Sequence, residues 1–278
     1  MAKQSKGRGA LGFLYGTAPG RVILKAAASR PLSKAAGALL DSPLSKPLIK
    51  PFVEKNHIQL SEYRSDSFSC FNDCFTREIR PELRPFPADP QLLPSPCDGL
   101  LTVYPVQEGL VLPIKQSRYS IRDLLDGSPD ASRYSDGLCL VFRLCVDHYH
   151  RYSYIDDGRK GPNVFIPGEL HTVRPIALEA LPVFVRNCRE YTLMDTEHFG
   201  RVCQVEVGAM LVGRILNHHG EGQIHRAAEK GMFLYGGSTI VLLLEKGQVQ
   251  LRQDLLDAGA QGIEVPVRMG EALGRAST

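Results

Sequence analysis

A glycine pair followed by two hydroxyl residues occupies positions 236–239 and leads directly into the apolar run 240–244. Glycine permits positive φ angles and leaves its own carbonyl carbon unshielded, so Ser238 could attack the peptide bond after Gly237. Such an attack needs a base for the hydroxyl proton and donors for the oxyanion. Ser238 is therefore a candidate nucleophile for self-cleavage of the chain, and an ordinary turn is the alternative interpretation.

Three other residues offer the acid–base chemistry that this serine requires. Asp98 precedes a glycine where an apolar segment begins, a place that a simple Asp-Gly turn also suits. His150 lies in the titratable cluster 147–151, and we expect His148 and His150 to share one face of a strand. His171 is a lone histidine in an expected strand, where a structural role is also common.

The cysteines show neither a disulfide framework nor the pattern of a metal site. They number seven, and no signal peptide precedes them. Cys70 and Cys74 form the only short pair, and neither a second pair nor suitably spaced histidines follow it. We therefore expect no metal ion, reduced thiols and a cytosolic compartment.

Residues 1–55 form a basic arm. They hold ten Lys and Arg against two acidic residues, a net +8, so within a total of +3 residues 56–278 carry −5. Such an arm favours a polyanionic partner, and an anionic membrane surface fits better than nucleic acid because the arm has few aromatic residues. Four prolines prevent an apolar stretch of about 18 residues, the length that a membrane span needs. We expect residues 1–56 to form amphipathic helices at the membrane interface; a helical hairpin packed on its own domain is the alternative.

The remainder, residues 57–278, has the pattern of an α+β catalytic domain. After a linker with a helix over 68–80, short apolar segments alternate with Gly, Pro and Asp, which predicts a mostly antiparallel sandwich-like or barrel-like β structure. We expect one helix at 120–126 and a weakly structured tail from 253. The expected strands are 99–106, 110–115, 138–146, 149–155, 163–166, 169–174, 181–186, 190–194, 201–207, 209–216 and 239–246.

In their order along the chain, several segments resemble the phosphatidylserine decarboxylase family. Each is short, but their joint order across about 175 residues is specific. The segments are 71–86 (FNDCFTREIRPELRPF), 95–99, 149–151, 187–190, 199–200, 207–213, 229–231 and 236–239.

The resemblance implies a proenzyme that cuts itself between Gly237 and Ser238 into residues 1–237 and 238–278. Asp98 and a histidine would activate Ser238 as in a serine-protease triad, and Ser238 would become a covalent pyruvoyl cofactor. This group would form a Schiff base with phosphatidylserine and accept electrons as CO2 leaves, which gives phosphatidylethanolamine. His150 would reprotonate the product or hold the substrate carboxylate.

The resemblance and the basic arm together predict the partners of the enzyme and its location. We expect the two fragments to stay associated, peripheral binding at the cytoplasmic face of an anionic membrane, and no nucleic acid partner; a homodimer remains open.

At one position the sequence departs from the family pattern. A second histidine, three residues after the one in Tyr-His-Arg, commonly serves as the processing base, but this chain has Ser153 there. A hydroxyl cannot take up a proton near neutral pH. The base would then be His171, reaching across a hairpin that pairs its strand with that of Ser153, or His150 itself.

Two other functions fit parts of the pattern. A serine hydrolase would use an uncut Ser238 with Asp98 and His150, but the chain lacks the G-x-S-x-G elbow of such enzymes. A non-enzymatic membrane-adaptor barrel would use only the basic arm and the strands. A denaturing gel separates these functions, because only the decarboxylase yields two fragments.

Overall fold

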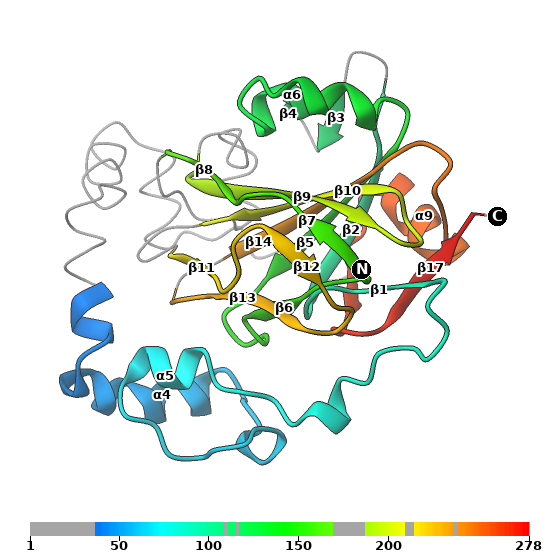
Figure 1. Ribbon diagram of the computed structural model, residues 1–278. Helices are drawn as coiled ribbons and strands as arrows, with labels where there is room; N and C mark the ends of the chain where they lie inside the picture. Colours follow the sequence, from blue (N-terminus) through cyan, green and yellow to red (C-terminus); the bar gives the residue numbers. More distant parts are fainter. Residues whose placement is uncertain are drawn as a thin grey trace.

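The computed structural model describes residues 37–107, 111–114, 117–168, 187–208, 214–235 and 238–277. A nine-stranded antiparallel sheet forms the centre, with smaller sheets and short helices on both sides (Figure 1). The α+β class expected from the sequence is confirmed. In spatial order the main strands are β12 (Gly222–Ile224), β7 (Gly158–Lys160), β9 (Arg189–Thr196), β10 (Arg201–Val207), β14 (Ser238–Leu244), β5 (Leu138–Leu144), β2 (Gly99–Pro105) and β16 (Val265–Val267), with β8 (Val164–Ile166) also pairing with β9.

Three small sheets and several short helices complete the described structure. The sheets are β11 (Ile215–Asn217) with β13 (Glu229–Phe233) and β6 (Arg151–Ser153); β1 (Leu92–Pro94) with β17 (Ala272–Ala276) and β15 (Val249–Leu251); and β3 (Val111–Ile114) with β4 (Ser117–Ser120). The α-helices are α4 (Ile49–Lys55), α5 (Phe71–Phe75), α6 (Ile121–Leu124) and α9 (Gln253–Ala260). The 3-10 helices are η1 (Pro43–Leu48), η2 (Leu60–Glu62), η3 (Pro81–Leu83) and η4 (Pro129–Tyr134).

Strand β14 lies at the middle of the main sheet, and all of its residues are buried. Successive side chains point to opposite faces of a strand, so Ile240 and Leu242 enter one core cluster while Val241 and Leu243 enter the other. A strand covered on both faces requires a continuous apolar run rather than an alternating one. This explains the run that follows Thr239 in the sequence.

A buried ion pair joins the main sheet to the β11–β13–β6 sheet. Lys230 Nζ lies 2.8 Å from Glu206 Oε1 and 2.9 Å from Asn217 Oδ1, and the side chains of Lys230 and Glu206 are both 0% exposed. Gln204 donates a further hydrogen bond to Glu206 Oε1 at 2.9 Å. Strands β13 and β10 are thus held together by charge as well as by apolar contact.

The described part of the basic arm is helical, as expected, and lies beside the β6–β13–β11 sheet (Figure 1). Ser42 caps η1 and prolines break the segment into short pieces. The Phe52 ring of α4 packs on Phe71 and Tyr235, with centroid distances of 5.0 Å and 6.5 Å. The helical segment therefore contacts the chain shortly before position 238.

The structure corrects several expected boundaries. The helix expected over 68–80 is only α5, because Cys70 caps its start, Thr76 leaves the helical conformation and Ile79 bridges to the extended chain at Tyr63. The tail from 253 is well structured: α9 buries Leu255, β16 pairs with β2, and β17 joins β1 and β15. The strand expected over 149–155 is shortened to β6, preceded by a turn. The strands expected at 169–174 and 181–186 lie outside the described residues.

Candidate active site

Ser238 is the first residue of β14, so it lies at one end of a central strand of the main sheet. Its Cα pairs with Leu144 of β5, and its neighbour Thr239 pairs with Val207 of β10. Strand alternation places the Ser238 side chain on the same face as Ile240, which belongs to the core cluster shared with Tyr152 and Phe233. The serine therefore faces the layer between the two sheets and is buried.

His150 approaches the same layer from the opposite sheet. It immediately precedes β6, and its carbonyl oxygen accepts a 2.9 Å hydrogen bond from the Phe233 amide of β13. The side chains of His150 and Tyr152 point inward and are both fully buried. Strand β13 then leads through Tyr235 toward Ser238, so both candidate residues lie near this end of the layer.

Both candidate residues carry a buried polar atom without a hydrogen-bond partner in the described part of the chain: Ser238 Oγ and His150 Nε2. His150 Nδ1 lies 2.9 Å from the His148 carbonyl oxygen, which can only accept, so Nδ1 carries the proton and Nε2 presents a lone pair. Burial lowers the His150 pKa to about 3, which keeps the ring neutral. A hydroxyl donor and an imidazole acceptor thus stand unused in one buried layer, as an acid–base reaction at Ser238 requires.

Asp98 is held by other partners. Its carboxylate accepts hydrogen bonds from Arg84 at 2.6 Å and 2.8 Å and from the Met269 amide at 2.8 Å. No hydrogen bond joins Asp98 to a histidine among the residues described. Because β5 lies between β2 and β14, the backbone near Asp98 is about 10 Å across the sheet from Ser238. The Asp–His contact of a triad is therefore absent from this part of the structure.

His148 does not share a strand face with His150. It closes a turn in which its Nδ1 accepts a 3.1 Å hydrogen bond from the Cys145 amide. The ring lines a pocket of about 400 Å³ together with Asp98 and Arg84. Burial lowers the His148 pKa, and the charges of Asp147 and Asp98 partly oppose this shift. The interaction between the two histidines is the hydrogen bond from His150 Nδ1 to the His148 carbonyl oxygen, and not a contact between adjacent rings.

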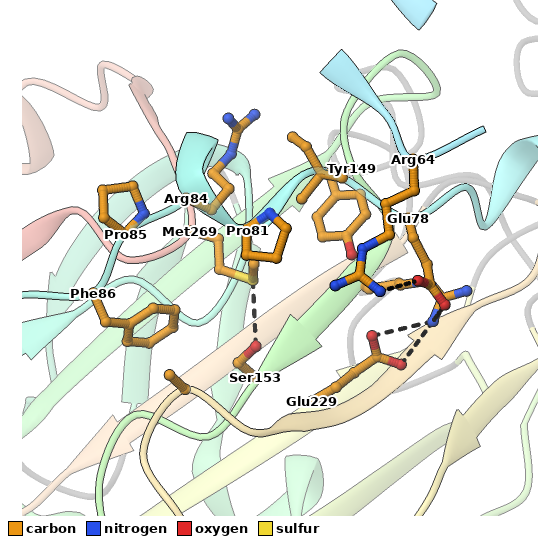
Figure 2. Close-up of a pocket in the computed structure, with 13 residues that line it drawn as sticks. Arg64, Glu78, Pro81, Arg84, Pro85, Phe86, Tyr149, Ser153, Glu229 and Met269 are labelled. Carbon is orange, nitrogen blue, oxygen red and sulfur yellow. Dashed lines mark hydrogen bonds and ion pairs between the residues drawn. The ribbon is translucent and has the colours of Figure 1, made fainter. Parts of the chain in front are cut away.

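Ser153 faces a second pocket, of about 420 Å³, on the outer side of β6 (Figure 2). Its hydroxyl lies 3.4 Å from Met269 Sδ, and Arg151 on the same side pairs with Glu229 at 3.0 Å. The backbone of Ser153 is flanked by Glu229 on one side and by the Pro96 carbonyl on the other. His171 itself, like Gly237, lies outside the described residues.

The aromatic residues of α5 were not expected at the site. The Phe75 ring stacks on His150 with centroids 4.1 Å apart and also contacts Tyr235 at 5.2 Å. The sequence predicts a helix and a family resemblance for the segment that contains Phe75, but no contact with His150. The contact between Phe75 and His150 joins two segments that are far apart in the sequence, so no local sequence signal could reveal it.

One group of side chains has the composition of a metal site. Ligand atoms of Cys145, Asp147 and His148 lie within 4.8 Å of one another. However, the guanidinium of Arg143 donates to Cys145 Sγ at 3.1 Å, and burial raises the Cys145 pKa. A cation already beside the thiol opposes metal binding.

The cysteines carry thiols, with no disulfide found in the described structure.

Comparison with known proteins assigns the chain to a family. The sequence profile of the family Phosphatidylserine decarboxylase matches residues 71–275. The chain is 41% identical over 273 residues to "Phosphatidylserine decarboxylase proenzyme 2" of Clostridium acetobutylicum, covering 98% of this chain and 93% of that protein. It is 38% identical to the "Phosphatidylserine decarboxylase proenzyme" of Ruminiclostridium cellulolyticum, with 98% and 93% covered, and 36% identical to that of Clostridium beijerinckii, with 94% and 90% covered. The chain therefore belongs to the phosphatidylserine decarboxylase family.

Proposed function

We propose that the chain is a self-processing phosphatidylserine decarboxylase whose Ser238 cuts the bond to Gly237. Attack of Oγ on the Gly237 carbonyl carbon converts the peptide bond into an ester. Loss of the α-proton of residue 238 then releases residues 1–237, and hydrolytic loss of ammonia leaves a pyruvoyl group. The observation that carries this proposal is the buried Ser238 hydroxyl without a partner in the described chain, at the start of a strand that follows two glycines.

The residues around position 238 fit a small neutral carbonyl group. Ser238 is buried, no charged side chain among the described residues bonds to it, and the lone pair of His150 belongs to the same layer. The pyruvoyl group supplies the electron sink for the charge left when phosphatidylserine loses CO2 to become phosphatidylethanolamine. His150 then returns a proton to the substrate carbon after Nε2, the atom that has no other partner in the described structure, has taken one up from water; holding the substrate carboxylate would likewise require the protonated ring.

We assign the processing step to a histidine acting on Ser238, with His171 as base and His150 as the alternative. Asp98 enters this proposal as a buried carboxylate whose charge stabilises the protonated base. Its bidentate pairing with Arg84 keeps it in one orientation at the N-terminal end of β2.

The two fragments should remain associated after cleavage. Strand β14 pairs with β10 on one side and with β5 on the other, and its apolar side chains are buried on both faces. The fragment 238–278 also supplies β16 to the main sheet, and β15 and β17 to the sheet that contains β1. Separation would expose all of these surfaces to water, which opposes it strongly.

The proposal includes peripheral binding to an anionic membrane at its cytoplasmic face. None of the described helices combines the length and the apolar composition that a membrane crossing requires. Leu39, Leu44 and Leu48 are 52%, 79% and 48% exposed, and Lys46 and Lys50 lie between and beside them. Apolar side chains interleaved with lysines suit an anionic interface. Analytical ultracentrifugation would decide between a monomer and a homodimer.

A denaturing gel with mass spectrometry tests the function. The purified chain should appear as two fragments, the smaller one starting with a pyruvoyl group at position 238. Ser238→Ala should remain a single chain. Thr239→Val is the matched control, because Thr239 Oγ1 is also buried without a partner in the described structure but points to the other face of β14. An uncut wild-type chain, or cleavage of Ser238→Ala, would contradict the proposal.

A further inference from the structure

Helix α5 contacts both sides of the proposed cleavage apparatus. Its Phe75 ring stacks on the His150 imidazole, with centroids 4.1 Å apart. Its Phe71 and Phe75 rings also enclose the Tyr235 ring edge-on, at 4.9 Å and 5.2 Å. One short helix thus touches the histidine and the strand end that precedes Ser238.

A chain of hydrogen bonds fixes the backbone at this point. Asn72 Oδ1 accepts a 3.1 Å hydrogen bond from the Tyr235 amide, and Asn72 Nδ2 donates a 2.7 Å bond to Asp41 Oδ1. Asp41 Oδ2 in turn pairs with Arg214 at 3.2 Å, and the Arg214 carbonyl accepts the Leu234 amide at 3.0 Å. The side chain of Asn72 is buried, with 3% exposed. The backbone at positions 234–235 is therefore held from two directions.

The chemistry of an amide explains why asparagine occupies position 72. The Tyr235 amide needs an acceptor, and the Asp41 carboxylate needs a donor. An amide side chain supplies one of each at the required separation, whereas a carboxylate supplies only acceptors. Since a fixed oxygen faces Tyr235 and a fixed nitrogen faces Asp41, the orientation of the side chain is determined by its two partners.

We propose that Asn72 is a positioning residue for self-cleavage: through Tyr235 it orients the segment that carries the Gly237 carbonyl toward Ser238. This inference rests on the proposed self-processing function. Nucleophilic attack requires the reacting atoms at about 3 Å with correct alignment, so a small displacement of the preceding backbone costs rate without unfolding the chain. Asp41 belongs to the same apparatus, which links the helical segment of the basic arm to the cleavage point.

The test is a pair exchange between positions 72 and 41. Asn72→Asp retains an acceptor for Tyr235 but places two carboxylates face to face, so we expect cleavage at least about tenfold slower. Asp41→Asn alone has one acceptor oxygen for two donors, so its NH2 must face either Asn72 Nδ2 or Arg214, and we expect it to slow cleavage as well, by less than Asn72→Asp. The double variant Asn72→Asp/Asp41→Asn restores a donor opposite a carboxylate, and we expect it to recover most of the rate. Such a cycle isolates the pair from the rest of the structure.

Pulse–chase after cell-free synthesis gives the cleavage rate, with wild type and Ser69→Ala beside the variants. Ser69 bonds to Asp73 on the exposed side of α5 and has no hydrogen bond to Tyr235, so Ser69→Ala should cleave normally. Each substitution is also placed in the uncut Ser238→Ala chain, and its urea midpoint is measured. The proposal requires an Asn72→Asp chain whose loss of rate exceeds what the shift of its urea midpoint accounts for, and rescue by Asp41→Asn.

Three results would overturn the inference while leaving the proposed function intact. They are normal cleavage of Asn72→Asp, a rate loss that follows the loss of stability in the uncut chain, and failure of the double variant to recover. A wild-type chain that does not cleave would instead refute the proposed function itself. The two failures are therefore distinguishable in one experiment.

Discussion

Burial of His150 should make the uncut protein unstable in acid. The folded-state pKa of His150 is lowered by burial to about 3, from 6.5. The ring is neutral when folded and takes up a proton below pH 6.5 when unfolded, so its contribution to stability is complete above pH 6.5 and is lost as the pH falls toward 3. Each pKa unit corresponds to about 1.4 kcal/mol, so from pH 7 to pH 4.5 the loss is about 2–3 kcal/mol. No reduction for solvent screening applies, because the ring is 0% exposed.

The assay is urea unfolding of the uncut Ser238→Ala chain at a series of pH values. Circular dichroism is the suitable signal, because the chain contains no tryptophan. Other carboxylates and histidines also change protonation over this range. We therefore compare Ser238→Ala with Ser238→Ala/His150→Asn, in which the amide can still donate to the His148 carbonyl. The difference in the free energy of unfolding between the two chains isolates His150.

We expect this difference to fall by about 2–3 kcal/mol between pH 7 and pH 4.5. A difference that stays flat would show that His150 is not held neutral by burial. A difference that rises as the pH falls would show that its pKa is raised instead, which would indicate a partner carboxylate. Either result would remove the basis for Nε2 as a free lone pair.

Three other predictions concern the fold and the membrane. Lys230→Met leaves Glu206 buried and unpaired and should cost about 3–5 kcal/mol in urea unfolding, whereas Lys230→Met with Glu206→Gln should recover much of this loss; equal stability of the two variants would contradict it. Lys46→Gln with Lys50→Gln should weaken vesicle binding by about 1 kcal/mol per charge in low salt, with no effect on neutral vesicles. Gly259→Ala should lower stability by about 1–3 kcal/mol, because a Cβ there would lie 2.4 Å from a main-chain oxygen of β2; an unchanged midpoint would show that α9 can shift without cost.

The sequence predicted those elements whose own pattern is strong. Strands β10 and β14 and helix α6 agree closely with expectation, because an apolar run or a cap followed by an apolar turn marks each of them. Strand β13 was missed, since it begins with Glu229 and Lys230. Charged residues indicate a solvated segment. Strand β13 can be buried here only because Lys230 pairs with Glu206. Helix α9 was missed because it is short and contains a glycine.

The site residues, like the strands and helices, could be predicted only where a local sequence pattern marks them. Ser238 and His150 stand in local motifs, so the sequence could nominate both of them. The partner of Asp98 could not be predicted, because Arg84 and Asp98 approach each other through chain segments that carry no mutual signal. The contacts of α5 with His150 and Tyr235 depend on how distant segments pack together. Local patterns thus identify reactive residues, while their supporting contacts require the tertiary structure.

The low pKa of His150 bears on the division of work between the two histidines. A base is most effective when its pKa lies near the working pH, and a group with a pKa of about 3 removes a serine proton poorly. For the return of a proton to the substrate carbon, the ring must first take one up from water, and the conjugate acid then gives it up readily. We therefore expect His150→Ala to be cut but to lack decarboxylase activity, and His171→Ala to remain uncut. His198→Ala serves as control, because that ring pairs with Asp156 in a separate turn. If His171→Ala is cut normally and His150→Ala is not, then His150 is the base, and cleavage proceeds despite its low pKa.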